Sequence, residues 1–483
     1  MGVKGYLRWH GPFMQNALAA LCLGLTAGIY VALSGLGAGG GQATSQHMID
    51  IAQASCDAAS LVAGLFCGVM LNKFGPAICA SVGAVGYAVY VGGFWYFGEH
   101  GTLAFPVTGA TILGITAVLI ESTVSYIAIA YSEEREKGLY VTMMQVIKYG
   151  CSLVAATIPL AIDASNPKAT SVPTAVYITF IILMSSAVVL GLFILPAEKI
   201  RRDDGTGIAV LPKLTFKDAM LGGFHTLADK RLLLLCPALI CTAIHLVYCG
   251  IANAYHNNSR VRALNTFCAL AVAIPSNLVL SWLLDNRRWS RKTRALAGTT
   301  YVGVFLIGAF IAEVVRTWHW SRVVPHTKMD WTSPDFAGQF ILFIVGWNAA
   351  GMILNLATWY LGTLSNDPLI CSHYAGLSRA LLAVGQGFVF GIDAAGIPYR
   401  NEAGALLGMF SISMLGMYIF AFTCVQETRY FKEEHVIVPR YAQEQLGHIQ
   451  GQEAREGAKP GADGSDEVHT EVIVSTTGEK NTA

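Results

Sequence analysis

Long apolar stretches occupy most of this 483-residue chain, and their lengths constrain its fold more than any other feature. A helix needs roughly 20 mostly apolar residues to cross the hydrocarbon core of a bilayer. Twelve segments meet this requirement: 12–36, 49–71, 76–97, 103–131, 139–163, 172–196, 231–252, 264–284, 295–315, 336–362, 373–392 and 402–424. The count is weakest at 103–131, which contains Glu121, and at 373–392, which contains Arg379 and is the least hydrophobic. We predict an all-α membrane protein with twelve transmembrane helices.

Composition agrees with a bilayer environment and excludes several classes of function. Only 13% of residues are charged, against about 25% in ordinary soluble domains. The net charge of +1 and the lack of a basic domain argue against a nucleic-acid partner. Most of the eleven cysteines lie inside apolar stretches, without C-x-x-C pairs or metal-type spacing to histidine. We therefore expect no metal site, no cofactor and no enzyme, and Gly39–Gly41 lacks the Lys-Ser/Thr of a nucleotide loop.

The distribution of basic residues predicts the orientation, because cytoplasmic loops of membrane proteins are enriched in lysine and arginine. With both termini in the cytoplasm, 17 basic residues precede the tail on the inner side: Lys4, Arg8, Lys73, Arg135, Lys137, Lys199, Arg201, Arg202, Lys213, Lys217, Lys230, Arg231, Arg287, Arg288, Arg291, Lys292 and Arg294. The outer loops hold 7: Lys168, Arg260, Arg262, Arg316, Arg322, Lys328 and Arg400. Asn257-Asn258-Ser259 is a predicted N-glycosylation acceptor on an outer loop.

Changes in polarity along the chain divide it into four regions. The polar segment 197–230 is the predicted cytoplasmic linker between an N-terminal six-helix half, 1–196, and a C-terminal six-helix half, 231–424. Residues 425–483 are rich in Glu, Gly, Gln and Thr and lack an apolar period, so we predict a largely disordered cytoplasmic tail. No clear sorting signal is present, which leaves the plasma membrane and endomembranes both open.

Two similar loops follow the second and eighth spans. The sequence from Gly68 to Gly75 reads GVMLNKFG, and that from Ser281 to Arg288 reads SWLLDNRR. Both resemble the signature G-x-x-x-D-R/K-x-G of the major facilitator superfamily and its weaker second copy. In that family the acid caps a neighbouring helix and the base engages a carboxylate, whereas this chain has Asn72 in place of the first acid. The resemblance implies gating residues in both loops: Gly68, Asn72, Lys73, Gly75, Asp285 and Arg287.

Further short patterns resemble the uncoordinated-93-like branch of that superfamily, including its fungal members. In chain order they are GLGAGGGQ at 35–42, RDDGT at 202–206, RALN at 262–265, Trp359, SNDP at 365–368 and YAG at 374–376. The resemblance covers about residues 1–430 and implies two pseudo-symmetric six-helix bundles that permit alternating access. Animal relatives regulate a potassium channel or escort other membrane proteins, and fungal members are presumed transporters. The resemblance therefore implies the fold, and it leaves both transport and a role beside another membrane protein open.

Two ionisable residues inside predicted spans are the leading site candidates, because such groups are costly in a bilayer. Glu121 and Lys148 each lie about ten residues from the cytoplasmic ends of the fourth and fifth spans, or roughly 15 Å deep. A short loop joins these spans, so we infer that the two side chains meet near the midplane. Gln145, Lys148, Tyr149 and Ser152 follow helical spacing and give the fifth span a polar face. One reading is a substrate or proton site, and the other is a buried pair that only fixes packing.

The remaining polar candidates are single residues in other spans. Asp57 could line the mouth of a cavity, and His245 could transfer a proton or simply be hydrogen-bonded. Asn277, Asn348 and Asn355 could bind a polar substrate or join helices to one another. Gly24 and Gly28 form a G-x-x-x-G pattern that is typical of close helix packing.

These observations lead to two hypotheses about function. The first is a secondary transporter that moves a small solute by alternating access, with protons as a candidate coupling ion. The second is an accessory protein that regulates or escorts another membrane protein without transporting anything. An enclosed polar cavity near Glu121 and Lys148 favours the first, and a cavity filled by apolar side chains favours the second.

Overall fold

The structure is a computed structural model that describes residues 8–35, 43–165, 174–212, 214–322, 327–433 and 435–444. The predictions made on Gly39–Gly41, on Lys168 and on most of the tail lie outside these residues. The described chain is helical: α2 (Pro12–Leu23), a π-helical turn (Gly24–Gly28), α3 (Ile29–Gly35), α4 (Ala43–His100), α5 (Ala104–Ala130), α6 (Lys137–Ser165), α7 (Thr174–Gly191), α8 (Phe216–Leu227), α9 (Lys230–Ile240), α10 (Ile244–His256), α11 (Ser259–Leu284), α12 (Arg291–Arg316), α13 (Phe336–Leu364), α14 (Pro368–Ala394) and α15 (Tyr399–Thr423).

The predicted twelve spans are confirmed. Eleven helical stretches among the described residues are long and apolar enough to cross a membrane, and one of them, Met48–His100, holds two spans. Gly75 divides it, with φ 78° and ψ 169° in the middle of α4, and Pro76 follows directly. A side chain is disfavoured at positive φ, and proline starts a helix more readily than it continues one. The chain therefore ends the second span at Gly75 and starts the third at Pro76.

The first and seventh spans are both interrupted near their middles. The first contains the π-helical turn Gly24–Gly28, which lies against α6: a Cβ on Gly24 would lie 2.6 Å from Cys151 Sγ. The seventh breaks between α9 and α10, where Ala243 leaves helical geometry at φ −134° and ψ 3°. π-Helical turns and broken membrane helices are common at functional sites, since they free backbone groups and change the direction of side chains.

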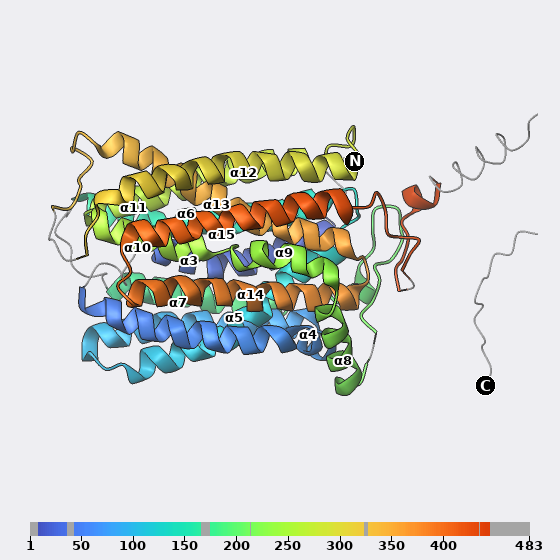
Figure 1. Cartoon of the computed structure of the whole chain (residues 1–483). Helices are drawn as coiled ribbons and strands as arrows, with labels where there is room; N and C mark the ends of the chain where they lie inside the picture. The colour runs from blue at the N-terminus through green and yellow to red at the C-terminus, as the bar shows by residue number, and fades with distance from the viewer. Residues whose placement is uncertain are drawn as a thin grey trace, which may run out of the picture. The chain divides into compact units, whose positions relative to one another are not determined.

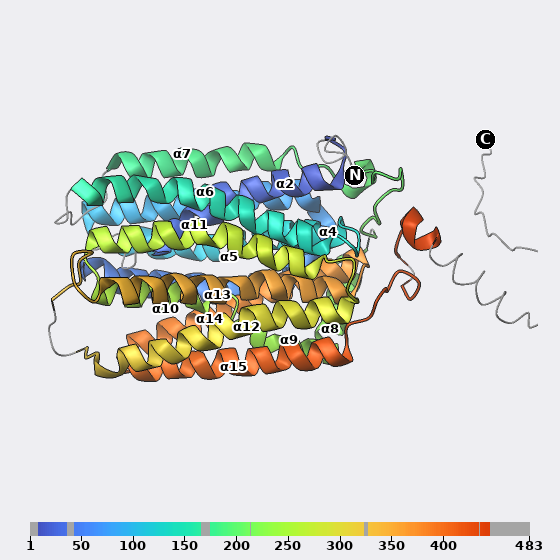
Figure 2. The same ribbon diagram turned by 90° about the horizontal axis from the view of Figure 1, so that it is seen from above.

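The exterior and the interior of this bundle differ as expected for a protein in lipid. Large apolar side chains point outward with more than half of their surface exposed, among them Val154, Ile182, Val304, Val315 and Ile412. Such a surface would be costly in water and suits acyl chains. The interior is close-packed around buried aromatic side chains that include Trp347, Trp359, Phe310 and Phe410. The membrane-spanning helices run side by side along one common direction, and α8 crosses that direction at one end (Figures 1 and 2).

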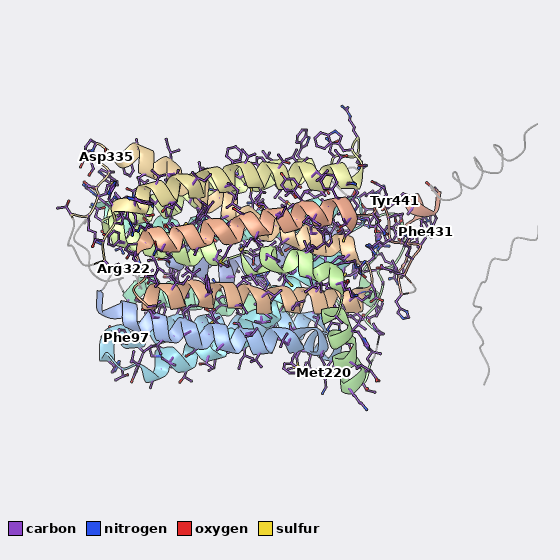
Figure 3. The ribbon with its side chains drawn as sticks, in the orientation of Figure 1. Phe97, Met220, Arg322, Asp335, Phe431 and Tyr441 are labelled. Atoms are coloured by element: carbon purple, nitrogen blue, oxygen red, sulfur yellow. The ribbon has the colours of Figure 1, made fainter. Side chains whose placement is uncertain are left out.

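One end of the bundle, here called the linker end, carries the connection between the sixth and seventh spans. That connection includes α8, and it contains a turn at Gly205, whose φ is 83°. Figure 3 places Met220 of α8 and Phe431 at this end, and Arg322 and Asp335 at the opposite end. The cytoplasmic position of the linker end stays a prediction.

The predicted boundaries at 196, 230 and 424 also stay predictions. The contacts within the chain divide it only once, into Met1–Val438 and Pro439–Ala483, and so do not test them. Within the first unit, the chain beyond α15 packs against the linker end. Tyr430 is buried, and Arg429 donates from its backbone N–H to the Glu134 carboxylate at 3.0 Å. The change in composition at 425 therefore does not coincide with the end of the packed structure.

Candidate functional site

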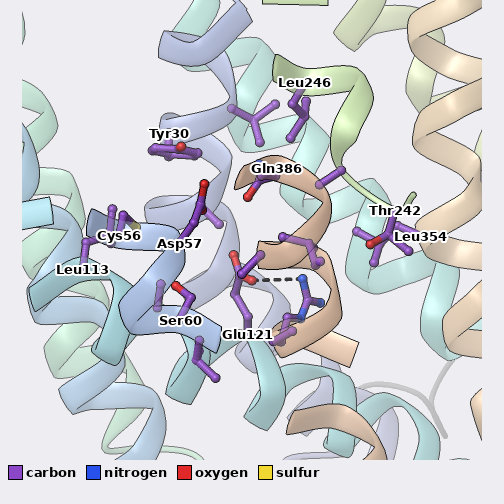
Figure 4. Close-up of a pocket in the computed structure, with 18 of the residues that line it drawn as sticks. Tyr30, Cys56, Asp57, Ser60, Leu113, Glu121, Thr242, Leu246, Leu354 and Gln386 are labelled. Carbon is purple, nitrogen blue, oxygen red and sulfur yellow. Dashed lines mark hydrogen bonds and ion pairs between the residues drawn. The ribbon is translucent and has the colours of Figure 1, made fainter. Parts of the chain in front are cut away.

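A cavity with ionisable and apolar side chains on its wall lies between the two six-helix bundles, and its empty space, open solvent at its mouth included, is about 850 Å³. Its lining residues come from the first, second, third, fourth and fifth spans on one side and from the seventh, tenth and eleventh on the other. Each of them is nine or more residues from the linker end of its helix, which is about 13 Å at 1.5 Å per residue. The cavity thus occupies the middle of the spans. Figure 4 shows residues that line it.

Glu121 lines this cavity, but its partner is not Lys148. The Arg379 guanidinium of α14 donates to the Glu121 carboxylate at 2.9 Å, and the hydroxyl of Tyr87 donates to the other oxygen at 2.9 Å. Arg379 also donates to Ser125 Oγ at 3.0 Å. The dashed line in Figure 4 marks the ion pair. The inferred pairing of Glu121 with Lys148 is wrong, because Glu121 faces the second bundle rather than the next helix in sequence.

Lys148 lies on the cavity wall without an acidic partner. Its side chain is 7% exposed and makes no hydrogen bond or ion pair with any residue that the structure describes. Its ammonium lies over the ring of Tyr149, whose centroid is 4.9 Å from Nζ. A buried ammonium without a counter-ion is costly, so this position favours an anionic group from outside the chain.

His245 and Tyr149 lie together beside Gly351 of α13. A Cβ built on Gly351 would lie 3.2 Å from Tyr149 Oη and 3.4 Å from His245 Nε2. Neither ring nitrogen of His245 has a hydrogen-bond partner within the described part of the chain, and its ring meets Trp347 edge to face at 5.7 Å. The missing side chain at Gly351 leaves space between two groups that can hydrogen-bond a ligand.

Asp57 lies on another part of the cavity wall. Its side chain is buried, and Gln53 donates to Oδ1 at 3.1 Å. Oδ2 is buried and has no hydrogen-bond partner among the described atoms. Tyr30 in turn donates to Gln53 at 3.0 Å. Figure 4 shows Asp57 and Gln386 on neighbouring helices at the same level of the cavity.

Three of the predicted site residues are not on the cavity wall. Asn348 donates to the backbone oxygen of Ala269 at 3.1 Å and so joins α13 to α11. Asn355 donates to Thr142 Oγ1 and to Asn277 Oδ1, both at 3.0 Å, and so joins α13 to α6 and α11. Gln145 is buried and does not line the cavity. The two asparagines therefore act as interhelical contacts in this structure.

Between the cavity and the linker end, polar contacts join the bundles. Glu134 accepts from Asn366 Nδ2 at 2.7 Å and pairs with Arg291 at 3.3 Å. Lys137 donates to Asn366 Oδ1 at 2.8 Å and to the backbone oxygen of Gly362. Burial alone would raise the pKa of the Glu134 carboxyl, but Arg291, Lys137 and the hydrogen bonds hold that pKa below its ordinary value. Glu134 is therefore ionised at neutral pH.

The second predicted gating loop meets the start of α6. Asp285 accepts from the backbone N–H of Gly138 at 2.9 Å and from that of Leu139, so its carboxylate caps α6 from the other bundle. Arg287 pairs with Glu136 at 3.3 Å. This matches the arrangement that the resemblance implies for an acid and a base in this loop.

The first predicted gating loop is arranged differently. Asn72 donates to the backbone oxygen of Pro212 in the linker at 2.7 Å, and Lys73 lies over the ring of Phe74. The helix that an acid at position 72 would be expected to cap, α14, is instead capped by its own Asp367, which accepts from Leu369 N at 2.8 Å.

Near this loop the two bundles are joined by close packing of α4 against α14, and not by an acid that caps a helix. A Cβ on Gly68 would lie 2.4 Å from His373 Nδ1, and a Cβ on Gly64 would lie 2.8 Å from the backbone N of Ala380. The backbones of the second and eleventh spans can approach this closely only because both positions are glycine.

The geometry does not support the predicted glycosylation at Asn257. This residue is 2% exposed, its Nδ2 donates to Asn253 Oδ1 at 2.8 Å, and its Oδ1 accepts from Gln339 at 3.0 Å. A glycan would need that amide nitrogen free and facing solvent. The sequon lies at the tight connection between α10 and α11.

Sequence reasoning missed several residues of the cavity. Arg379 is the most important, and its signal was present: it lies inside the predicted span 373–392, eleven residues after the start of α14, and an arginine inside a span meets the general rule for functional candidates. Three further lining residues carry no charge and so gave no such signal in the sequence: Gln53, Tyr30 and Gln386. No group of three or more His, Cys, Asp or Glu that could hold a metal ion occurs among the described residues.

Comparisons with known proteins agree with this architecture. No family model matches the chain. The chain is 32% identical over 404 residues to the uncharacterized membrane protein C6F6.04c of Schizosaccharomyces pombe, covering 83% of this chain and 82% of that protein. It is 25% identical to UNC93-like protein 1 of Arabidopsis thaliana, with 82% of this chain and 86% of that protein covered.

Solved structures show the same fold at low sequence identity. The fucose:proton symporter FucP in an outward conformation superposes with a TM-score of 0.58 at 11% identity, covering 86% of this chain and 99% of that chain. The proton:xylose symporter XylE superposes with a TM-score of 0.56 at 13% identity, covering 84% and 94%. The protein is thus a multi-pass membrane protein with the major facilitator fold, and it belongs to the UNC93-like family.

Proposed function

We propose that this protein is a secondary transporter that moves a small polar solute by alternating access. The observation that carries the proposal is the mid-span cavity between the bundles, whose wall holds ionisable groups that lack partners among the residues the structure describes. Ionisable groups are kept inside a membrane protein when a substrate or an ion uses them. Apolar side chains such as those of Leu113, Leu246 and Leu354 also line this space, but they do not fill it, whereas an escort protein would tolerate a filled space.

The contacts that close the linker end are of a kind that can reopen. Glu134, Asp285 and Lys137 hold the bundles together through hydrogen bonds and ion pairs, which water can replace when the bundles separate. Opening this end and closing the opposite one would present the cavity to the other side of the membrane.

Glu121 and Arg379 are the proposed site of proton coupling. They join the two bundles at the depth of the cavity, so protonation of Glu121 would remove an attraction between the bundles. The two-bundle movement would then respond to the proton gradient.

The proposal is tested with purified protein in proteoliposomes, by uptake and counterflow of candidate solutes with and without a pH gradient. We expect flux that depends on the gradient in the parent protein and loss of that dependence in Glu121→Gln at unchanged reconstitution. Flux that ignores the gradient in both proteins would refute the coupling, and no flux of any solute would refute transport.

A second candidate is an accessory protein that holds or escorts another membrane protein. Asn72 favours it, because the first gating loop lacks the acid and is bound to the linker through Pro212. This candidate predicts no flux together with co-purification of one membrane protein in stoichiometric amount from the native membrane. A disulfide that locks the linker end should then leave the cellular phenotype intact.

A further inference from the structure

The cavity wall carries two buried groups of opposite charge that no described residue neutralises. Lys148 on α6 is 7% exposed, and Asp57 on α4 is 6% exposed. Neither forms an ion pair with a described residue, although each is in a setting where an unpaired charge is expensive.

The Lys148 side of the cavity is built to receive an acid. Three donors are available there: the Lys148 ammonium, the Tyr149 hydroxyl and a ring nitrogen of His245. Tyr149 and His245 border the space that a side chain at position 351 would fill. A Cβ built on Gly351 would lie 3.2 Å from Tyr149 Oη and 3.4 Å from His245 Nε2. We call Lys148, Tyr149, His245 and Gly351 the acid pole.

The Asp57 side is built to receive a cation or another strong donor. Gln53 satisfies Oδ1 at 3.1 Å, and Oδ2 is buried without a partner. Gly387 of α14 faces this carboxylate, with its Cβ position 3.9 Å from Oδ2, so no side chain of that residue fills the space. We call Asp57, Gln53 and Gly387 the amine pole.

The remaining charges of the cavity compensate one another. Glu121 and Arg379 form a direct ion pair at 2.9 Å, so together they add no net charge. The cavity as a whole is therefore close to neutral but has one positive and one negative end. An anion would leave Asp57 uncompensated, a cation would leave Lys148 uncompensated, and a neutral solute would satisfy neither.

We infer that the cavity binds a small zwitterion of the amino-acid class, with its carboxylate at the acid pole and its ammonium at the amine pole. This inference rests on the proposed function in taking the cavity as the transport site. Binding itself requires no movement of the bundles, so the two can be tested separately.

The test measures binding by the purified full-length protein in detergent, by calorimetry and thermal shift. The probes are α- and ω-amino acids of increasing length, the same compounds N-acetylated to remove the cation, the same compounds amidated to remove the anion, and glucose. We expect free amino acids to bind at least ~10-fold more tightly than either blocked form, because each pole contributes a charge-assisted contact. The length that binds best reports the separation of the poles.

Variants test which pole binds the carboxylate and which binds the ammonium. Lys148→Gln should abolish the preference over amidated probes and keep that over N-acetylated ones, and Asp57→Asn should do the reverse. Gly351→Ala should weaken binding of every carboxylate probe by filling the acid pole. Gly346→Ala in the same helix is the matched control, because its Cβ would only touch Ala309 at 3.8 Å.

Several outcomes would overturn the inference. They are equal binding of free and N-acetylated amino acids, variants that leave both preferences unchanged, and binding of glucose or of none of the probes. If zwitterions bind as expected but do not cross the membrane in proteoliposomes, the proposed transport fails and the inference stands. If another solute class is transported and no zwitterion binds, the inference fails and the transport proposal stands.

Discussion

Arg379 of α14 lies 2.9 Å from Glu121 of α5, and this ion pair joins the two bundles at the depth of the cavity. The guanidinium side chain is 6% exposed and that of the glutamate 22%, so the pair is removed from most but not all solvent. Removing one member of such a pair leaves the other as an isolated charge, whereas removing both can be nearly neutral.

Arg379→Met should therefore lower stability more than the double change Glu121→Gln with Arg379→Met. We expect a loss of about 3 kcal/mol for the single variant, since an uncompensated carboxylate remains in the span. Thermal unfolding of the purified proteins, followed by size-exclusion chromatography, measures the difference. Equal loss in the single and double variants would show that packing of the arginine stem, rather than charge, holds the bundles together here.

The lowered pKa of the Glu134 carboxyl predicts that the stability of the protein depends on pH. Its carboxyl has a pKa below the ordinary value of 4.5, with burial opposed by Arg291 and Lys137. A depressed pKa means that the folded protein holds this proton less tightly than the unfolded chain does. The stabilisation is therefore fully present above about pH 4.5 and is lost as the pH falls through the folded value.

Glu134→Gln should lose that stabilisation at every pH. At neutral pH we expect the free energy of unfolding to fall by roughly 3 kcal/mol relative to the parent, because the side chain of Arg291 is only 1% exposed and would lack its carboxylate partner. The variant should therefore melt at a lower temperature. The difference between the two proteins should shrink below pH 4.5. A difference that stays constant from pH 7 to pH 3.5 would contradict a role for the ionised form.

Sequence alone predicted the fold well and the cavity only in part, for a physical reason. Spans are detectable because their length and apolarity reflect the bilayer, and each helix encodes that property by itself. The partner of Glu121 depends on how α5 is rotated about its axis, which is fixed by packing against α14, 258 positions further along the chain. Hydrophobic periodicity gives little help with this rotation, because a helix in lipid is apolar nearly all round. For the same reason the sequence could not predict that Asn355 points toward α6 and α11 rather than into the cavity.

Gly64→Ala should separate α4 from α14. Its Cβ would lie 2.8 Å from the backbone N of Ala380 and 2.9 Å from the backbone oxygen of Gly376, and backbone atoms cannot move aside as flexible side chains can. We expect lower thermal stability and a larger accessibility of the linker end to a thiol reagent at an introduced cysteine. Gly404→Ala in α15 is the matched control, because nothing lies within 4 Å of its Cβ position. That control should be neutral or gain up to about 1 kcal/mol from helix propensity.

Asn72→Asp restores the acid that the superfamily signature carries, and we expect it to harm this protein. The Asn72 side-chain N–H₂ donates to Pro212 O at 2.7 Å, while an ionised aspartate has no donor and would oppose that carbonyl oxygen. The helix that an acid could cap, α14, already has Asp367 at its N-terminus. The linker should therefore detach, seen as faster proteolytic cleavage between α7 and α9 than in the parent. Asn72→Ala, which loses the hydrogen bond without adding a charge, should be cleaved at an intermediate rate. Aspartate that protects the linker as well as asparagine does would mean that the first loop retains the gating arrangement that the signature implies.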